Sequence, residues 1–188
     1  MAEALRDTIA DDGGAGLALE AAGVGAWRWD AATDTLHLSP VARRLLGLGA
    51  SETGTPAFLA RIHPADRASV AGTMRAAGGG EAFDLDFRTA AADGAGHWLR
   101  LRGRASACPD GRHEARGILI DIAGRKAAEE ANARLAAIVA SSEDAIIAKT
   151  LDGVVTDWNS GAAKIFGYSA EEMIGRPIAR LLLLGLEF

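Results

Sequence analysis

The feature that most constrains the fold is a change of hydrophobic period near the middle of the chain. In the segment 65–77, just before the triplet Gly78-Gly79-Gly80, Val70 and Met74 recur at helical spacing. Beyond it, Phe83, Leu85 and Phe87 alternate with charged residues, and Leu99 and Leu101 alternate with Trp98 and arginines. A period of two places every apolar side chain on one face of an extended strand. The sequence therefore predicts two long strands, each with one apolar and one charged face.

The residues between these strands indicate how they pair. If Ala92-Asp93-Gly94 forms a three-residue hairpin loop with Gly94 in the left-handed conformation, Ala91 faces Ala95 and the remaining register follows by counting. The apolar rows then meet on one face, and opposite charges and a cation–π pair meet on the other. The pairs predicted on the charged face are Asp86 with Arg100, Asp84 with Arg102, and Arg88 with Trp98.

Three more strands complete the predicted sheet. Trp27 and Trp29 alternate with polar residues in a strand over 26–30, and a second strand over 35–38 follows a turn at Thr33-Asp34. After a turn at 109–111, residues 114–122 are rich in Ile and Leu, which favours a strand.

Helices are predicted between the second and third strands. Ser39-Pro40 is typical of a helix start and Gly47 of a helix end. A longer helix is predicted over 65–77, with Asp66 in its first turn. A further short helix is predicted over 16–22, before the first strand. The predicted fold class is α+β: a five-stranded antiparallel sheet with helices inserted between strands two and three, followed by a linker helix.

From Ala123 to about Ser141 the pattern is helical. Its apolar residues recur at spacings of three, four and three, which is typical of a coiled-coil seam. The seam is barely two heptads long and half of it is alanine, so pairing would need support from flanking domains. Together with the outer face of the sheet, this seam gives the predicted dimer interface: Trp98, Ala128, Ala131, Leu135 and Ile138.

The chain also contains a weak internal repeat. Placing Leu45-Leu46-Gly47 on Ile165-Phe166-Gly167 gives an offset of 120 residues, the difference between 167 and 47. The same offset pairs Ser39 with Asn159, and both are favourable helix N-caps. Strands at 145–149 and 154–158 and a capping box beginning at Ser169 complete the second copy.

Both copies resemble PAS domains, the small sensory domains of bacterial signalling proteins. In the first copy the resemblance spans roughly residues 17–126. Its matching segments are 62–67 (IHPADR), 83–88 (FDLDFR), 93–104 with its Trp98, and 121–126 (DIAGRK). In the second copy the matching segments are 152–160 (DGVVTDWNS) and 163–177 (AKIFGYSAEEMIGRP).

The second copy stops early. In the first copy 75 residues separate Gly47 from Ile122, whereas 21 follow Gly167, so about 54 residues and all three long strands are missing. We expect a flexible tail over 1–15, a PAS domain over 16–122, a linker helix over 123–142 and the first part of a truncated second PAS domain over 143–188. Without its sheet partners, this last segment is expected to be disordered, swapped into a partner or packed on a neighbour.

Charge and cysteine content exclude several classes of protein. A net charge of -5 provides no electrostatic footprint for nucleic acid. The single cysteine, Cys108, allows neither an intramolecular disulfide nor a cysteine-rich metal site. Residues 1–12 lack the apolar run of a signal peptide or membrane anchor. We expect a cytoplasmic protein without a nucleic-acid partner and without a membrane segment in this sequence.

The inner face of the sheet offers space for a small ligand, and the alternative is a filled apolar core. In the PAS family a flavin adduct needs a reactive cysteine in a helical segment, but Cys108 lies in a predicted turn. A haem sensor of the common type needs a histidine within the long helix, but 65–77 contains none and His63 precedes it. We predict neither cofactor and no metal or catalytic site. The candidate lining residues for an unknown ligand are Trp27, Trp29, Leu36, Phe58, Phe83, Leu85, Leu99 and Leu101.

The resemblance also points to a junction between sheet and exit helix. In the family it usually reads Asp-Ile-Thr, and the aspartate and a following basic residue hold the helix to the sheet. Here Ala123 replaces the threonine, and Asp121 and Arg125 are the predicted relay residues; ordinary helix-start chemistry is the alternative.

The resemblance implies a sensory module of a multi-domain signalling protein. A histidine kinase of a two-component system is the first expectation, with the signal leaving through the linker helix to an output domain. The alternatives are a dimerisation or interaction module that senses nothing, and the sensor of a cyclic-dinucleotide enzyme. The chain itself is expected to catalyse no reaction and to pair with a second copy.

Overall fold

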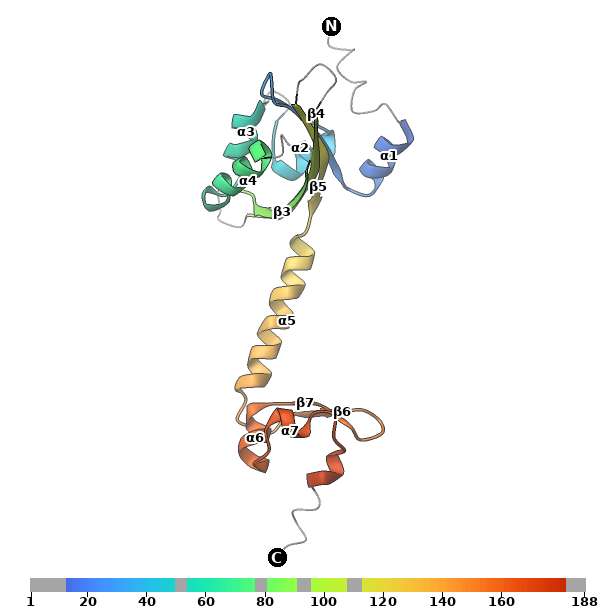
Figure 1. Cartoon of the computed structure of the whole chain (residues 1–188), viewed down its shortest axis with the longest axis vertical. Coiled ribbons are helices and arrows are strands. Elements are labelled where there is room, and N and C mark those ends of the chain that lie inside the picture. The colour runs from blue at the N-terminus through green and yellow to red at the C-terminus, as the bar shows by residue number, and fades with distance from the viewer. Residues whose placement is uncertain (1–12, 50–53, 77–80, 91–95, 108–112, 182–188) are drawn as a thin grey trace, which may run out of the picture. The chain divides into compact units, whose positions relative to one another are not determined.

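The computed structural model of the chain describes residues 13–49, 54–76, 81–90, 96–107 and 113–181 (Figure 1). The predicted hairpin loop at 92–94, the glycine helix end at 78–80, the turn at 109–111, most of the N-terminal tail and Cys108 lie outside these residues. The chain divides into two compact units, Met1–Lys126 and Ala127–Phe188, which are described separately.

The first unit contains the predicted five-stranded antiparallel sheet, with strand order β2-β1-β5-β4-β3. The β3–β4 register is also the predicted one, with Asp86 opposite Arg100, Asp84 opposite Arg102, and Arg88 opposite Trp98. The strands are β1 (Gly25–Asp30), β2 (Thr35–Leu38), β3 (Ala82–Arg88), β4 (Trp98–Ala107) and β5 (His113–Asp121).

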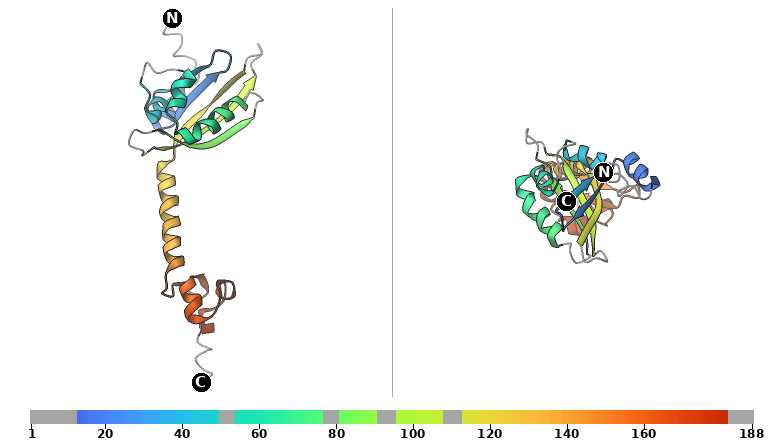
Figure 2. Two further views of the ribbon diagram at one scale, coloured as in Figure 1. Left: turned by 90° about the vertical axis from the view of Figure 1, so that its left-hand side faces the viewer. Right: turned by 90° about the horizontal axis from the view of Figure 1, so that it is seen from above.

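Four helices accompany this sheet: α1 (Gly13–Ala21), α2 (Pro40–Leu46), α3 (Gly54–Ala60) and α4 (Pro64–Ala76). Figures 1 and 2 show α3 and α4 on one side of the sheet and α1 on the opposite side. The start and end of α2 are the predicted ones: the Ser39 side chain accepts from the Ala42 amide, and Gly47 adopts the left-handed conformation at the C-cap.

The core lies between the helices and the inner face of the sheet. Phe87 is fully buried and meets Phe58 of α3 edge-on, with ring centroids 6.2 Å apart. Leu99 and Leu101 of β4 are buried beside it, whereas Phe83 and Leu85 are only partly buried. The predicted alternation along β3 and β4 is therefore correct. Burial deepens toward the C-terminal end of β3, which lies beside the junction of α3 and α4.

Trp27 fits into this core because two glycines face it. Gly117 lies opposite Trp27 in the sheet, and Gly103 lies opposite Gly117. A Cβ at Gly103 would come within 2.5 Å of the Trp27 ring, and one at Gly117 would overlap the Arg102 carbonyl. The indole therefore extends across both glycines to Phe83, at a centroid distance of 5.7 Å, and donates to the Ile118 carbonyl at 3.1 Å.

The linker helix α5 (Ala123–Ser141) starts in the first unit and runs into the second. It is followed by β6 (Ile147–Lys149), β7 (Val155–Trp158), α6 (Ser160–Phe166) and α7 (Ala170–Met173). A small core of Val155, Trp158, Ala162 and Met173 holds the second unit together. The described part of 143–181 thus packs on itself within this single chain. Within the described residues, no helix is long and apolar enough to cross a membrane.

The second unit repeats the first at the predicted offset of 120 residues. Trp27 pairs with Leu38 between β1 and β2, and Ile147 pairs with Trp158 between β6 and β7. Ser39 caps α2 through the Ala42 amide, and Asn159 caps α6 through the Ala162 amide. Since each pair differs by 120 positions, the weak sequence repeat corresponds to a repeated hairpin and helix.

Candidate functional site

The candidate ligand space in the core is small. The cavity between the helices and the sheet has a volume of about 10 Å³, which is about the room that one water molecule needs. Four of the predicted lining residues border it, namely Trp27, Leu36, Phe58 and Leu101. Sequence reasoning missed the other four, Leu38, Leu46, Met74 and Leu119, which come from β2, α2, α4 and β5.

The other four predicted lining residues lie elsewhere. Phe83 contacts the Trp27 ring, and Leu99 is buried in the core beside the cavity. Trp29 turns its indole N–H toward the Asp34 carboxylate, at 3.0 Å, near the surface. Leu85 packs against the core while partly exposed. Alternation along a strand assigned each of these side chains to the inner face, but it does not distinguish the cavity from the core around it.

Neither haem nor flavin fits this cavity. Pockets that hold a small organic ligand usually have volumes of about 300–1,000 Å³. The cavity is far smaller, and its eight lining side chains are apolar, with no histidine or cysteine among them. A ligand as large as haem or flavin would enter only if core side chains such as Met74 moved.

The outer face of the sheet carries a charged cluster centred on Asp86. Its carboxylate accepts from Arg100 of β4, with Oδ1–Nε at 2.6 Å and Oδ2–Nη2 at 3.2 Å. The same Oδ2 accepts from Arg125 Nη2 at 3.0 Å and lies 3.4 Å from Lys126 Nζ. One carboxylate on β3 therefore joins the neighbouring strand to the first turn of α5.

These contacts explain the acidity of Asp86. The hydrogen bond from Arg100 is the largest cause that lowers its pKa, from 3.8 to about 2, and the hydrogen bonds from Lys126 and Arg125 add to it. Partial burial acts in the opposite direction and is outweighed. Asp86 is thus an anion at any physiological pH.

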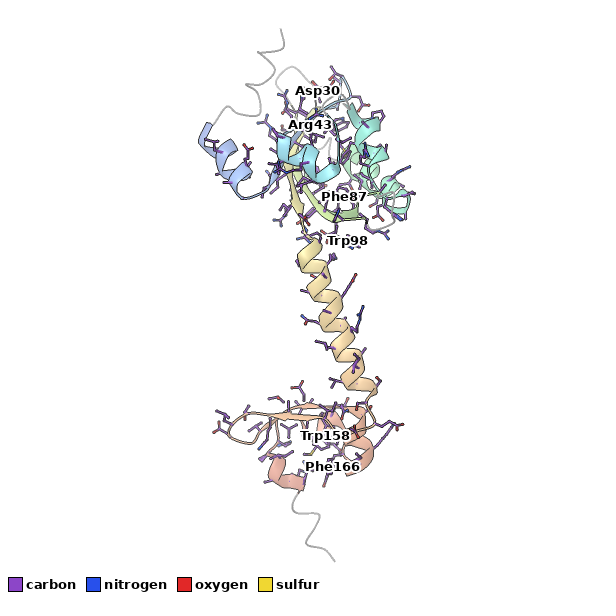
Figure 3. The ribbon with its side chains drawn as sticks, turned by 180° about the vertical axis from the view of Figure 1, so that it is seen from behind. Asp30, Arg43, Phe87, Trp98, Trp158 and Phe166 are labelled. Carbon is purple, nitrogen blue, oxygen red and sulfur yellow. The ribbon has the colours of Figure 1, made fainter. Side chains whose placement is uncertain are left out.

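A second charged contact extends the cluster to α4. Asp66 binds Arg88 through two side-chain contacts, at 2.7 and 2.9 Å, and also accepts from the Arg88 amide at 3.0 Å. The hydrogen bond from Arg88 is the main reason that the pKa of Asp66 falls to about 2. Arg88 also lies over the Trp98 ring, as predicted, and Lys126 lies over the same ring at 4.9 Å from its centroid. Trp98 therefore stands where the sheet meets the start of α5 (Figure 3).

The two predicted relay residues have different partners. Asp121 Oδ1 accepts from the Ala123 amide at 2.8 Å, which is helix-start chemistry, and Arg125 binds Asp86. Sequence reasoning paired Asp86 with Arg100 correctly but missed its contact with the helix. Since 39 residues separate Asp86 from Arg125, no local pattern indicates that contact.

The predicted seam on α5 is exposed to solvent. Leu135 is 60% and Ile138 is 58% exposed, and Val139 beside them is 39% exposed. Ala128 and Ala131 are also exposed, so the whole seam lies open along one chain. Large apolar side chains exposed in a row on one helix are typical of a surface that another helix covers.

Comparison with known proteins supports a sensory role. The family model for the PAS fold matches residues 17–122 and 133–183. The chain is 34% identical, over 173 residues, to the sensor protein FixL of Bradyrhizobium diazoefficiens; the match covers 87% of this chain and 34% of FixL. The chain therefore spans about a third of that relative's length.

Solved structures are also similar to this chain. A sensory box histidine kinase/response regulator from Burkholderia thailandensis E264 superposes with a TM-score of 0.52 at 28% identity, covering 64% of this chain and 92% of that one. The N-terminal domain of a diguanylate cyclase with PAS/PAC sensor, from Marinobacter aquaeolei, matches with a TM-score of 0.49 at 21% identity; it covers 55% of this chain and 98% of that one.

Proposed function

The chain belongs to the PAS fold family, and we propose that it is the sensory module of a histidine kinase whose signal leaves the first unit through α5. Its similarity to the sensor protein FixL and to a sensory box histidine kinase supports this assignment. In this proposal the chain performs no chemistry of its own, and the kinase reaction belongs to a separate output domain.

The observation that carries the proposal is the position of Phe87 between Asp86 and Arg88. Phe87 is fully buried against Phe58, whereas its two neighbours on β3 point to the outer face, as strand geometry requires. Asp86 holds the first turn of α5, and Arg88 lies over Trp98 beside Lys126. A shift of Phe87 in the core therefore displaces the groups that hold the exit helix.

A second copy completes the module in this proposal. Leu135 and Ile138 leave an apolar seam on α5 open, and pairing two such helices would bury it. Parallel pairing of the linker helices would bring the two output domains to the same end of the dimer.

The relay is tested by a change in the core that is read at the helix. Phe58→Leu alters the packing against Phe87 without replacing Asp86 or any residue that contacts it. In the single variant Phe58→Leu, the rate of hydrogen exchange of the amides at 125–128 should differ from that of the unaltered chain. When Asp86→Asn is also present, Phe58→Leu should change this rate much less. Asp84→Asn is the matched control: Asp84 contacts Arg102 and Arg100 on the same face, and within the part of the chain that the structure describes it has no ion pair with α5. Unchanged exchange at 125–128 in Phe58→Leu would contradict the relay.

The small cavity favours a second candidate function, an interaction module that binds no ligand. The cavity bordered by Trp27, Phe58 and Met74 has only about 10 Å³, as expected where side chains pack as in a domain interior. A thermal-shift screen separates the two functions. A ligand sensor gains stability by RT ln(1 + [L]/Kd), whereas an interaction module responds only to its own concentration.

A further inference from the structure

The Asn159 side chain holds the C-terminal end of α5 as well as the start of α6. Its Oδ1 accepts from the amides of Ile146 and Ala162, at 2.9 and 2.8 Å. Its Nδ2 donates to the carbonyls of Val139 and Asp144, at 3.0 and 2.9 Å, with the Ser142 carbonyl at 3.5 Å. Asn159 is only 7% exposed. These contacts use both acceptor sites and both donors of its side-chain amide, so the buried group is fully satisfied.

Of the carbonyls that Asn159 reaches, that of Val139 lies in the last turn of α5, where its backbone donor is the Ser142 amide at a long distance of 3.4 Å. The last four carbonyls of a helix have no partner within that helix. Val139 and Ala140 lie in the last turn of α5, and the Ser160 hydroxyl donates to the Ala140 carbonyl at 2.5 Å. Two adjacent side chains at the start of α6 therefore cap the end of α5, 20 residues earlier in the chain.

The first unit solves the same problem without a side chain. Its Leu19 carbonyl, 120 positions before that of Val139, accepts from the Val24 amide at 2.8 Å. Gly23 makes this local turn possible through its left-handed conformation, with φ of 68°. Ser39, which corresponds to Asn159, accepts from Ala26 and Ala42, the counterparts of Ile146 and Ala162, and so performs only the N-cap half of the role.

The second unit lacks that glycine. Glu143 stands at the position of Gly23, and its φ is not positive. The segment after α5 instead lies close against α6: a Cβ at Gly161 would overlap the Asp144 carbonyl and lie 2.7 Å from the Glu143 carbonyl. The cap of α1 is thus local, whereas the end of α5 combines a long local contact with donors from side chains at the start of the next helix.

We propose that Asn159 is a latch that makes the end of the linker helix and the start of α6 depend on each other. A displacement of the last turn of α5 breaks the bonds from Nδ2 and disturbs the N-cap that the same side chain provides. The contacts of the latch do not depend on the proposed function. Only its signalling role does, in which a signal that arrives along α5 enters the second unit at Asn159.

The first unit supplies the variants that test the latch. Asn159→Ser copies Ser39: it keeps an acceptor for Ala162 and Ile146 and removes the donors to the α5 carbonyls. Amide exchange measured by mass spectrometry or NMR on the full chain should accelerate at least about tenfold over 139–142, with Ala162 protected as before. Adding Glu143→Gly copies Gly23 and should slow exchange over 139–142 again, because a backbone cap replaces the lost amide.

Ser39→Asn is the matched control. The Leu19 carbonyl already has a backbone donor, so exchange at the end of α1 should stay as in the unaltered chain. The latch is refuted if Asn159→Ser leaves exchange over 139–142 unchanged, if protection of Ala162 is lost to the same extent, or if Glu143→Gly restores nothing. The readouts at 139–142 and Ala162 lie within the second unit and the control at α1 within the first, so none of them depends on whether the relay from the core to α5 is found.

Discussion

Asp86 on β3 and Arg125 in the first turn of α5 are joined at 3.0 Å, and the contact brings a negative charge to a helix start whose first turn has no acidic residue. A helix N-terminus carries a partial positive charge that acidic residues normally offset. The first turn of α5 contains no acidic residue and instead carries Arg125 and Lys126. Asp121 already places one carboxylate at the Ala123 amide, and Asp86 adds a second negative charge from β3, so the start of α5 also depends on the position of β3.

Replacing Asp86 should therefore weaken both the sheet face and the helix start. Asp86→Asn removes the charge that Arg100, Arg125 and Lys126 share while keeping the size of the side chain. We expect a loss of about 1–2 kcal/mol in the free energy of unfolding, since the group is partly exposed and water screens the contacts. Urea denaturation followed by circular dichroism measures it.

Asp84→Asn serves as the control for that change. The Asp84 side chain is 40% exposed and binds Arg102 at 2.7 Å. Loss of this contact in Asp84→Asn should lower the free energy of unfolding by about 0.5 kcal/mol or less. An equal cost for the two variants would show that the link to α5 contributes nothing to stability.

Acid should destabilise the first unit over a defined pH range. The pKa values of Asp66 and Asp86 are both lowered to about 2 from 3.8 by arginine contacts. A carboxylate with a depressed pKa stabilises the fold fully above its unfolded pKa, and this stabilisation is lost as the pH falls through the folded pKa. The free energy of unfolding should therefore fall between about pH 4 and pH 2. Urea titrations at fixed pH values should show a shallower fall for Asp86→Asn, and an identical slope would contradict the assignment.

The glycine facing Trp27 should not tolerate a side chain. Gly103→Ala places a methyl group about 2.5 Å from the Trp27 ring and 2.7 Å from Phe83, both within the packed sheet face. Overpacking of this kind costs about 1–3 kcal/mol, which chemical denaturation resolves. Gly72→Ala in α4 is the opposite case, with no atom within 4 Å of the added Cβ. It should stabilise the chain by about 0.5–1 kcal/mol, and a destabilised Gly72→Ala would argue against the α4 assignment.

Periodicity predicted the sheet because strand geometry leaves few choices. Once Phe83, Leu85 and Phe87 share a face, Asp84 and Asp86 must share the other, and complementary charges on the next strand select the register. The cavity was less accessible to this reasoning: Leu46 and Met74 reach it from helices whose packing depends on tertiary contacts. The same holds for the relay, where Asp86 finds Arg125 only after the sheet and helix have folded.

The repeat shows how a sequence signal can be weak while its structural consequence is strong. Few side chains are shared between the two copies, yet Ser39 and Asn159 accept from amides at equivalent positions. An N-cap requires only an acceptor at one position, so different residues satisfy it. The additional donors of Asn159 have no counterpart in Ser39, and sequence comparison alone classed both residues as caps.

Pairing of the linker helices is the remaining prediction, and it depends on the exposed seam of α5. Leu135 and Ile138 are more than half exposed, and burying one such side chain fully contributes about 1.5–3 kcal/mol. Leu135→Glu places a charge in the middle of the seam and should weaken self-association at least about tenfold, measured by sedimentation equilibrium of the full chain. Ala133→Glu adds the same charge at an exposed position outside the seam and should leave association unchanged. Equal weakening by both variants would attribute the effect to net charge, and unchanged association in Leu135→Glu would place the contact between copies elsewhere than on α5.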